Sequence, residues 1–228
     1  MLNRTLILLS VLLTASVLLL ANSATAADSQ AAAASAAEAT AAAPGGIATV
    51  AQDGSGDYTC IQAAINDFGS TEILVKPGIY KENILITKDL VIRTYDGPYT
   101  TVIDGSRRLR WTQGCGPQTT TQDDTILINP SVKVVIEGFC VTNGQDGIEI
   151  QKSDHVTLRN CIFWANKNNG IRIQENWPET QPPTTIIYNC ISAANGDCGI
   201  LIGFRPVSWQ CWCPPLLVMN SILIGNTE

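Results

Sequence analysis

The chain has 228 residues and a formal net charge of −6, from 20 acidic and 14 basic side chains. This acidic balance argues against general binding to nucleic acid, which requires a basic face. It leaves room for an acidic polysaccharide, because a local basic cleft can lie on an acidic body. The length suggests one or two domains.

Residues 1–26 have the pattern of a secretory signal peptide. Arg4 precedes an apolar run from Leu6 to Leu20, and Ala24-Thr-Ala26 is a small-residue cleavage site. The run is short for a membrane span, which needs about 20 apolar residues. An uncleaved anchor is the alternative interpretation. We therefore expect a secreted or extracytoplasmic protein with no membrane segment after cleavage, an alanine-rich linker at 27–46 and a folded domain at 47–228.

The folded domain is expected to open with a helix over 58–68, capped by Asp57. Its apolar face would cover the N-terminal end of the fold, because terminal units of a solenoid must hide their core. Four apolar segments after this helix have the pattern of strands. These begin at Glu72, Asn83, Leu90 and Thr101.

The second half of the chain repeats one phrase, in which isoleucines alternate after a glycine. Copies occur at intervals of 23 and 29 residues, as Gly147-Ile-Glu-Ile, Gly170-Ile-Arg-Ile and Gly199-Ile-Leu-Ile. A second apolar phrase follows each copy, and then an asparagine, at Asn166, Asn195 and Asn226. Periods of this length indicate a solenoid, and the alternation indicates strands. Asn and Gly tolerate the left-handed backbone of sharp turns. The sequence therefore predicts an all-β, parallel β-helix fold in which the glycines and isoleucines stack in successive turns.

The repeated phrases resemble the right-handed parallel β-helix of the pectate lyase (pectin lyase-like) superfamily, over roughly residues 46–228. The segment Pro77-Gly-Ile-Tyr-Lys-Glu82 is similar to the Gly-x-Tyr-x-Glu signature of pectin methylesterases and related β-helices. This resemblance implies a right-handed solenoid with an acidic polysaccharide such as pectin as its partner. It does not select one activity, because the fold hosts lyases, hydrolases, esterases, epimerases and non-catalytic adhesins.

Three long inserts are predicted to follow equivalent strands, after Asp104, Ile173 and Ile202. Insertions in solenoids collect on one flank, often the binding flank. The inserts contain aromatic and basic side chains suited to stacking on sugar rings and binding carboxylates. We expect a single substrate-binding groove lined by Trp111, Trp177, Trp209, Trp212, Arg107, Arg108, Arg110 and Arg205. The alternative is a structural role, in which these tryptophans only pack the inserts onto the coil.

The outward positions of the repeated strands form one column, which includes Glu149 and Arg172. Glu149 is a candidate substrate-binding residue, although an exposed ion pair with Arg172, contributing about 0–1 kcal/mol, is the simpler interpretation. Asp146, Arg172 and Arg205 are the candidate catalytic residues. Calcium, which takes several oxygen ligands, is a possible cofactor. Its candidate ligands are Asp123, Asp124 and Asp197.

Two activities of the superfamily have incomplete motifs in this chain. The paired aspartates of polygalacturonases correspond to Asn168 and Asn169, and their histidine corresponds to Cys198. The later signatures of pectin methylesterases are missing apart from a partial match at Gly203-Phe-Arg-Pro-Val-Ser-Trp209. A lyase or a uronate epimerase therefore remains, since both remove a proton next to a carboxylate.

The cysteines allow more than one arrangement. Cys161 and Cys190 belong to one column, where either a disulfide or stacked thiols fit, and Cys198 is predicted to pair with Cys211 or Cys213. The last coil is unfinished at Glu228, which suggests a truncated chain or a partner that covers its end. We predict an exported, carbohydrate-active protein that binds acidic glycans. A non-catalytic surface solenoid and an inactive fragment of a longer β-helix protein are the alternatives.

Overall fold

The computed structural model describes residues 46–106, 123–151, 153, 155–175, 184–204 and 216–227. These residues belong to one compact unit. The predicted signal peptide and the alanine-rich linker lie outside the described residues, apart from Gly46, which is the first residue of β1, so both stay predictions. Among the helices in the described residues, none is both long enough and apolar enough to cross a membrane.

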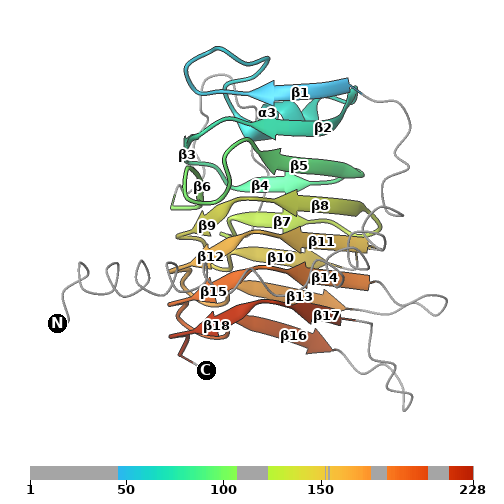
Figure 1. The fold of residues 1–228 in the computed structure, drawn as a ribbon. Coiled ribbons are helices and arrows are strands. Elements are labelled where there is room, and N and C mark those ends of the chain that lie inside the picture. The colour runs from blue at the N-terminus through green and yellow to red at the C-terminus, as the bar shows by residue number, and fades with distance from the viewer. Residues whose placement is uncertain are drawn as a thin grey trace, which may run out of the picture. The chain divides into compact units, whose positions relative to one another are not determined.

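The chain forms three parallel sheets that it visits in turn, once per coil (Figure 1). Sheet A has the order β1-β2-β5-β8-β11-β14-β17. Its strands are β1 Gly46–Val50, β2 Ser70–Val75, β5 Leu90–Thr94, β8 Lys133–Glu137, β11 His155–Arg159, β14 Thr184–Tyr188 and β17 Leu216–Met219. Sheet B contains β3 Gly78–Tyr80, β6 Thr101–Asp104, β9 Cys140–Thr142, β12 Ile162–Trp164, β15 Ile191–Ala193 and β18 Ile222–Ile224. Sheet C contains β4 Ile84–Ile86, β7 Ile126–Ile128, β10 Ile148–Gln151, β13 Ile171–Glu175 and β16 Ile200–Phe204. The predicted parallel β-helix is confirmed.

The predicted stacking of the repeated phrases is also confirmed. Ile148 pairs with Ile171, and Ile171 pairs with Ile200, each in parallel register. Ile148 and Ile171 are fully buried, and Ile200 packs against the same core. The period-2 alternation places these side chains inside the coil and the residues between them on the outer face of sheet C.

The turn asparagines form a hydrogen-bonded ladder between coils. The backbone N–H and the side-chain amide of Asn166 both donate to Asn195 Oδ1, at 3.0 Å each. Asn195 makes the same pair of bonds to Asn226 Oδ1, at 3.2 and 2.9 Å. This ladder explains the recurring glycines, because a Cβ atom on Gly147 would lie 2.7 Å from Asn166 Nδ2. Such an approach is too close for a real side chain.

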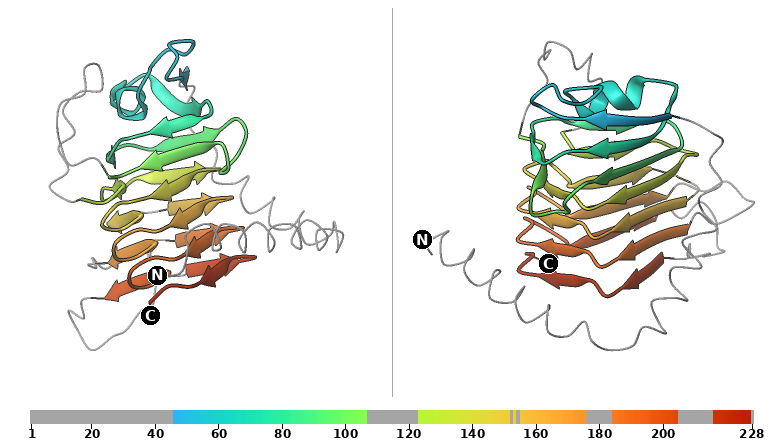
Figure 2. Two further views of the ribbon diagram at one scale, coloured as in Figure 1. Left: turned by 90° about the vertical axis from the view of Figure 1, so that its left-hand side faces the viewer. Right: turned by 45° about the horizontal axis from the view of Figure 1, so that its top comes forward.

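The N-terminal helix α3 covers Ile61–Asn66, and is shorter than predicted. Asp57 does not cap it, because its carboxylate instead accepts hydrogen bonds from the backbone and hydroxyl of Thr49. Glu82 of the next coil accepts the N–H groups of Ile61 and Gln62, at 2.9 Å each. These are two of the donors that a helix N-terminus leaves unsatisfied. Figure 2 shows α3 beside β1 and β2 at the start of the coil.

The helix buries a narrower apolar face than predicted. Ile61, Ala64 and Ile65 join the core, whereas Phe68 is 95% exposed and lies beyond the end of the helix. In the last described turn Leu217, Val218, Leu223 and Ile224 are exposed. Cys161 and Cys190 are buried thiols, the second of the two arrangements that the sequence left open.

Candidate functional site

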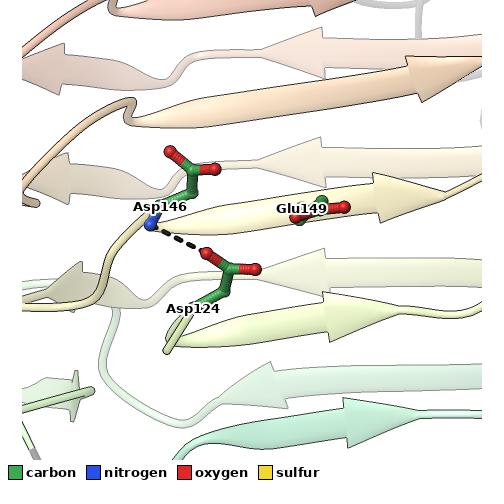
Figure 3. A group of neighbouring side chains, drawn as sticks. All are labelled: Asp124, Asp146 and Glu149. Carbon is green, nitrogen blue, oxygen red and sulfur yellow. Dashed lines mark hydrogen bonds between the residues drawn. The ribbon is translucent and has the colours of Figure 1, made fainter. Parts of the chain in front are cut away.

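Three acidic side chains meet where strands β7 and β10 of sheet C begin (Figure 3). Asp124 and Asp146 occupy the same turn position in successive coils, and Glu149 is an outer-face residue of β10. One oxygen from each of the three carboxyl groups lies within 4.8 Å of the others. All three side chains are buried, with exposures of 3%, 0% and 1%. We call this group the acidic centre.

Each carboxyl group of the acidic centre is held through one of its oxygens. Asp124 Oδ1 accepts the backbone N–H of Asp146 at 2.9 Å, the bond drawn in Figure 3. Asp146 Oδ1 accepts the backbone N–H and the side-chain amide of Asn169, at 2.9 and 2.8 Å. Glu149 Oε1 accepts the amide of Gln151 at 2.6 Å. The second oxygen of Asp146 accepts a hydrogen bond from Arg172, and that of Asp124 has no donor among the described residues.

Arg172, which pairs in register with Glu149 on the neighbouring strand β13, is the cation beside the acidic centre. Its Nη1 atom lies 3.4 Å from Asp146 Oδ2 and 3.9 Å from Glu149 Oε2. The Arg172 side chain is 36% exposed, whereas the two acids are buried. The expected exposed Glu149–Arg172 pair is therefore wrong in one respect. Glu149 is buried and accepts a hydrogen bond from Gln151, so only the Arg172 side chain of this pair is exposed to solvent.

The acidic centre contains more negative charge than Arg172 alone balances. Burying ionised carboxylates is costly unless they are paired, protonated or bound to a cation. Burial, reinforced by the nearby Glu149 and Asp146 carboxyl groups, raises the pKa of Asp124 to about 7, even though its hydrogen bond from Asp146 lowers it. Asp124 Oδ2 receives no hydrogen bond from a donor among the described residues. Asp124 Oδ2 is therefore the position in the acidic centre where a proton or a cation would be held.

The predicted calcium ligands do not come together as a set. Asp123, Gln145, Asn168 and Asp197 form a backbone ladder with bonds of 2.7, 2.8 and 2.8 Å between successive coils. Asp197 therefore lies three coils from Asp123, or about 14 Å at the usual strand spacing. Of the predicted ligands, Asp124 belongs to the acidic centre. Its companions there, Asp146 and Glu149, have a spacing that also suits a divalent cation.

The inserts do not follow equivalent strands, which corrects the prediction of a one-sided flank. The insert after Asp104 follows β6 of sheet B, whereas the inserts near Gln174 and Gly203 follow strands β13 and β16 of sheet C. The error arose because an alternating apolar strand looks the same in either sheet. The inserts therefore connect at opposite ends of the sheet C strands.

The predicted groove residues themselves are not part of the described chain. Trp111, Trp177, Trp209, Trp212, Arg107, Arg108, Arg110 and Arg205 all lie outside it. Their roles stay predictions, as does the pairing of Cys198 with Cys211 or Cys213. Of the candidate catalytic residues, Asp146 and Arg172 are brought together and Arg205 is outside the described residues.

Sequence reasoning missed strand β7, and with it the connection between Asp124 and Glu149. Asp124-Thr-Ile-Leu-Ile is a copy of Asp146-Gly-Ile-Glu-Ile, with Thr125 in place of the glycine. The threonine fits because Gly144 occupies the position that Asn166 holds in the next coil, and a Cβ atom there would meet the Thr125 side chain. In this coil the larger residue, Thr125, stands at the glycine position, and the glycine, Gly144, stands at the asparagine position. Asp124 stands before this copy as Asp146 stands before the next, and it was the remaining signal in the sequence that could have identified strand β7.

Comparisons with known proteins agree with the fold. Residues 111–208 match the family model for a right handed beta helix region. A probable pectinesterase/pectinesterase inhibitor 23 from Arabidopsis thaliana is 31% identical over 126 residues, covering 50% of this chain and 22% of that protein. A probable pectinesterase/pectinesterase inhibitor 6 from the same organism is 39% identical over 70 residues, covering 27% of this chain and 13% of that protein. The matched parts are thus less than a quarter of each relative.

Among solved structures, the chain is similar to a pectin methylesterase from carrot. The two are 17% identical with a TM-score of 0.46, and the match covers 80% of this chain and 65% of the other.

Proposed function

We propose that this chain, a right-handed parallel β-helix protein of the pectin lyase-like superfamily, binds an acidic polysaccharide of the pectin class on the outer face of sheet C. The observation that carries the proposal is the partly exposed Arg172 side chain beside a buried acidic centre. A guanidinium binds a carboxylate through two parallel hydrogen bonds. The sequence similarity to pectinesterases supports the substrate class.

The chemistry that fits this centre is removal of a proton next to a uronate carboxylate, as in a lyase or an epimerase. Glu149 projects from the outer face of sheet C in the same column as Arg172. A uronate ring bound to Arg172 would therefore lie beside the acidic centre, in which Asp124 is the group that gains and loses a proton. A group whose pKa is near 7 is well suited to gain and lose protons at neutral pH.

A binding assay tests the proposal. Affinity for polygalacturonate, for highly methyl-esterified pectin and for a neutral glucan is measured at several salt concentrations. The wild-type chain should prefer polygalacturonate, and its affinity should fall with salt because charge attraction is screened. Arg172→Ala should lose about tenfold in affinity, the effect of removing one charged hydrogen bond. Arg159→Ala is the matched control, because Arg159 pairs with Glu137 on the outer face of sheet A. Equal binding of the neutral glucan would contradict the proposal.

Catalysis is tested with the same polymer in deuterated water. A lyase forms an unsaturated product that absorbs in the ultraviolet, and an epimerase incorporates deuterium at the carbon next to the carboxylate. Binding with neither product would identify a non-catalytic adhesive solenoid.

Calcium is the second candidate occupant of the acidic centre. Three oxygens within 4.8 Å of one another, with Asp124 Oδ2 lacking a described donor, favour it. Calorimetric titration with Ca²⁺ should then show one site in the wild-type chain, lost in Asp124→Asn and kept in Asp197→Asn. No heat of binding would leave the proton as the occupant.

We also propose that the protein is exported. The predicted signal peptide supports this, and Cys60 is disulfide-bonded, as is usual in oxidising compartments. Secretion of a full-length fusion, with cleavage near residue 26, would test it.

A further inference from the structure

We propose that Asn169 is a positioning residue of the acidic centre. Its amide holds Asp146 by one oxygen and so directs the other toward Arg172, the residue that receives the glycan. This inference rests on the proposed function for its consequence, but its geometry can be tested without a ligand. The sequence had identified Asn169 only as the position where an acid of polygalacturonases is missing.

Two donors of Asn169 converge on one atom. The backbone N–H and Nδ2 both donate to Asp146 Oδ1, at 2.9 and 2.8 Å. Asp146 Oδ2 is left to face Arg172 Nη1 at 3.4 Å. Because Asp146 is fully buried and Asn169 is 3% exposed, water does not compete for these bonds.

The orientation of the Asn169 amide is itself fixed by the next coil. Asn169 Oδ1 accepts the backbone N–H of Cys198 at 3.2 Å. A flipped amide would point its NH₂ group at that donor and its oxygen at the Asp146 carboxylate, and would lose both interactions. The side chain therefore has one satisfied orientation, with Nδ2 toward Asp146.

The chemistry of this position requires an amide and not an acid. Asp124, Asp146 and Asn169 follow one another in successive coils of this hydrogen-bonded column. The first two residues are acids, and the third is a neutral amide. An aspartate at 169 would still accept from Cys198, but would turn a second oxygen toward Asp146 Oδ1. Two carboxylates in contact repel when both are ionised. The Asp146 carboxylate would then rotate away from its position beside Arg172.

Asn166 offers a matched control within the same turn. It is equally buried, at 2% exposure, and it makes the same two ladder bonds, to Asn195 Oδ1. None of its hydrogen bonds goes to a member of the acidic centre. Removing its side chain therefore reports the cost of losing a ladder asparagine alone.

The test combines Asn169→Ala, Asn169→Asp and Asn166→Ala. Both Asn169 variants should weaken polygalacturonate binding about tenfold, because a charged hydrogen bond is lost. Asn166→Ala should lower the unfolding temperature without changing the affinity. Once Arg172→Ala is present, Asn169→Ala should have no further effect on binding, whereas its effect should persist in an Arg159→Ala background.

A second readout separates this inference from the proposed function. The NMR signal of the Arg172 Nε–H group should shift in both Asn169 variants and stay in place in Asn166→Ala, with no glycan present. If the wild-type chain binds no uronate polymer while this signal still shifts, the proposed function fails and the positioning role stands. An unchanged Arg172 signal in Asn169→Asp, or equal losses of affinity in Asn166→Ala and Asn169→Ala, would overturn the inference.

Discussion

Asp124 shows how a single buried residue can make stability depend on pH. Its folded-state pKa of about 7 lies above the value of about 3.9 for an unfolded aspartate. Between these two values the folded chain holds a proton that the unfolded chain lacks. Its contribution is therefore complete below about pH 4 and is lost as the pH rises through about 7, by up to about 4 kcal/mol.

Asp124→Asn should remove this part of the pH dependence. An asparagine keeps the acceptor for Asp146 and supplies a donor toward Glu149, with no charge to bury. Urea unfolding at a series of pH values should give a flatter curve for the variant and greater stability than the wild type at pH 8. Asp197→Asn serves as the control, and parallel curves for Asp124→Asn and the wild type would contradict the account.

Ala165 and Ala194 adopt left-handed backbone angles, with φ of 52° and 55°. A residue with a Cβ atom pays about 1–2 kcal/mol for this conformation, and glycine does not. Ala194→Gly should therefore raise the free energy of unfolding by about 1 kcal/mol. Its neighbour Ala193 is a buried residue of strand β15. Ala193→Gly should therefore have the opposite effect and lower the free energy of unfolding by about 1 kcal/mol. Urea unfolding of the two variants tests the difference in sign.

At the scale of whole elements, the coil depends on the contact between glycines and ladder asparagines. A Cβ atom on Gly170 would lie 2.8 Å from Asn195 Nδ2 and would overlap the hydroxyl of Ser192. Gly170→Ala should destabilise the fold by about 1–3 kcal/mol, the usual cost of overpacking. Among the described residues, the nearest atom to a Cβ added at Gly203 of strand β16 would be Ile173 O at 3.8 Å, so Gly203→Ala should be tolerated. Equal thermal stability of the two variants would show that the ladder asparagines can move to accommodate a Cβ atom, and would contradict this account.

Glu82 links helix α3 to the coil that follows it. Replacing Glu82 by Ala leaves the N–H groups of Ile61 and Gln62 without this acceptor, at a cost of about 1–3 kcal/mol. Glu82→Gln keeps one acceptor oxygen and should lose less. Hydrogen exchange at Ile61 and Gln62 should accelerate most in Glu82→Ala. Unchanged exchange there would mean that the helix does not depend on this cap.

Much of the element level was predictable because repetition is visible in the sequence. The Gly-Ile-x-Ile phrases determined the register of β10, β13 and β16, and the turn asparagines marked the ladder. The cap on α3 was not predictable, because Glu82 lies 21 residues from Ile61 and joins it only through the coil. The acidic centre was only half predictable. Asp146 and Arg172 followed from the phrases, whereas Asp124 was hidden by a threonine in the glycine position.

On the scale of the whole molecule, all three long inserts connect to strands of sheet C: the first leads into β7, and the other two follow β13 and β16. The outer face of this sheet carries Arg172, and the acidic centre lies beneath that guanidinium. A net charge of −6 makes such a local cation important, because the chain as a whole repels a polyuronate. We therefore propose that recognition of an acidic glycan comes from this face and not from the general field of the protein.

The central claim is that Asp124 holds a proton in the acidic centre beside a glycan-binding Arg172. Carboxyl-carbon NMR of a chain labelled at Asp and Glu measures this directly, as a pH titration without and with an oligogalacturonate. The account predicts that Asp124 titrates near pH 7, and that the oligomer shifts the signals of Asp124 and Glu149 but not that of Asp197. An Asp124 signal that titrates near pH 4, and that the oligomer does not move, would contradict it.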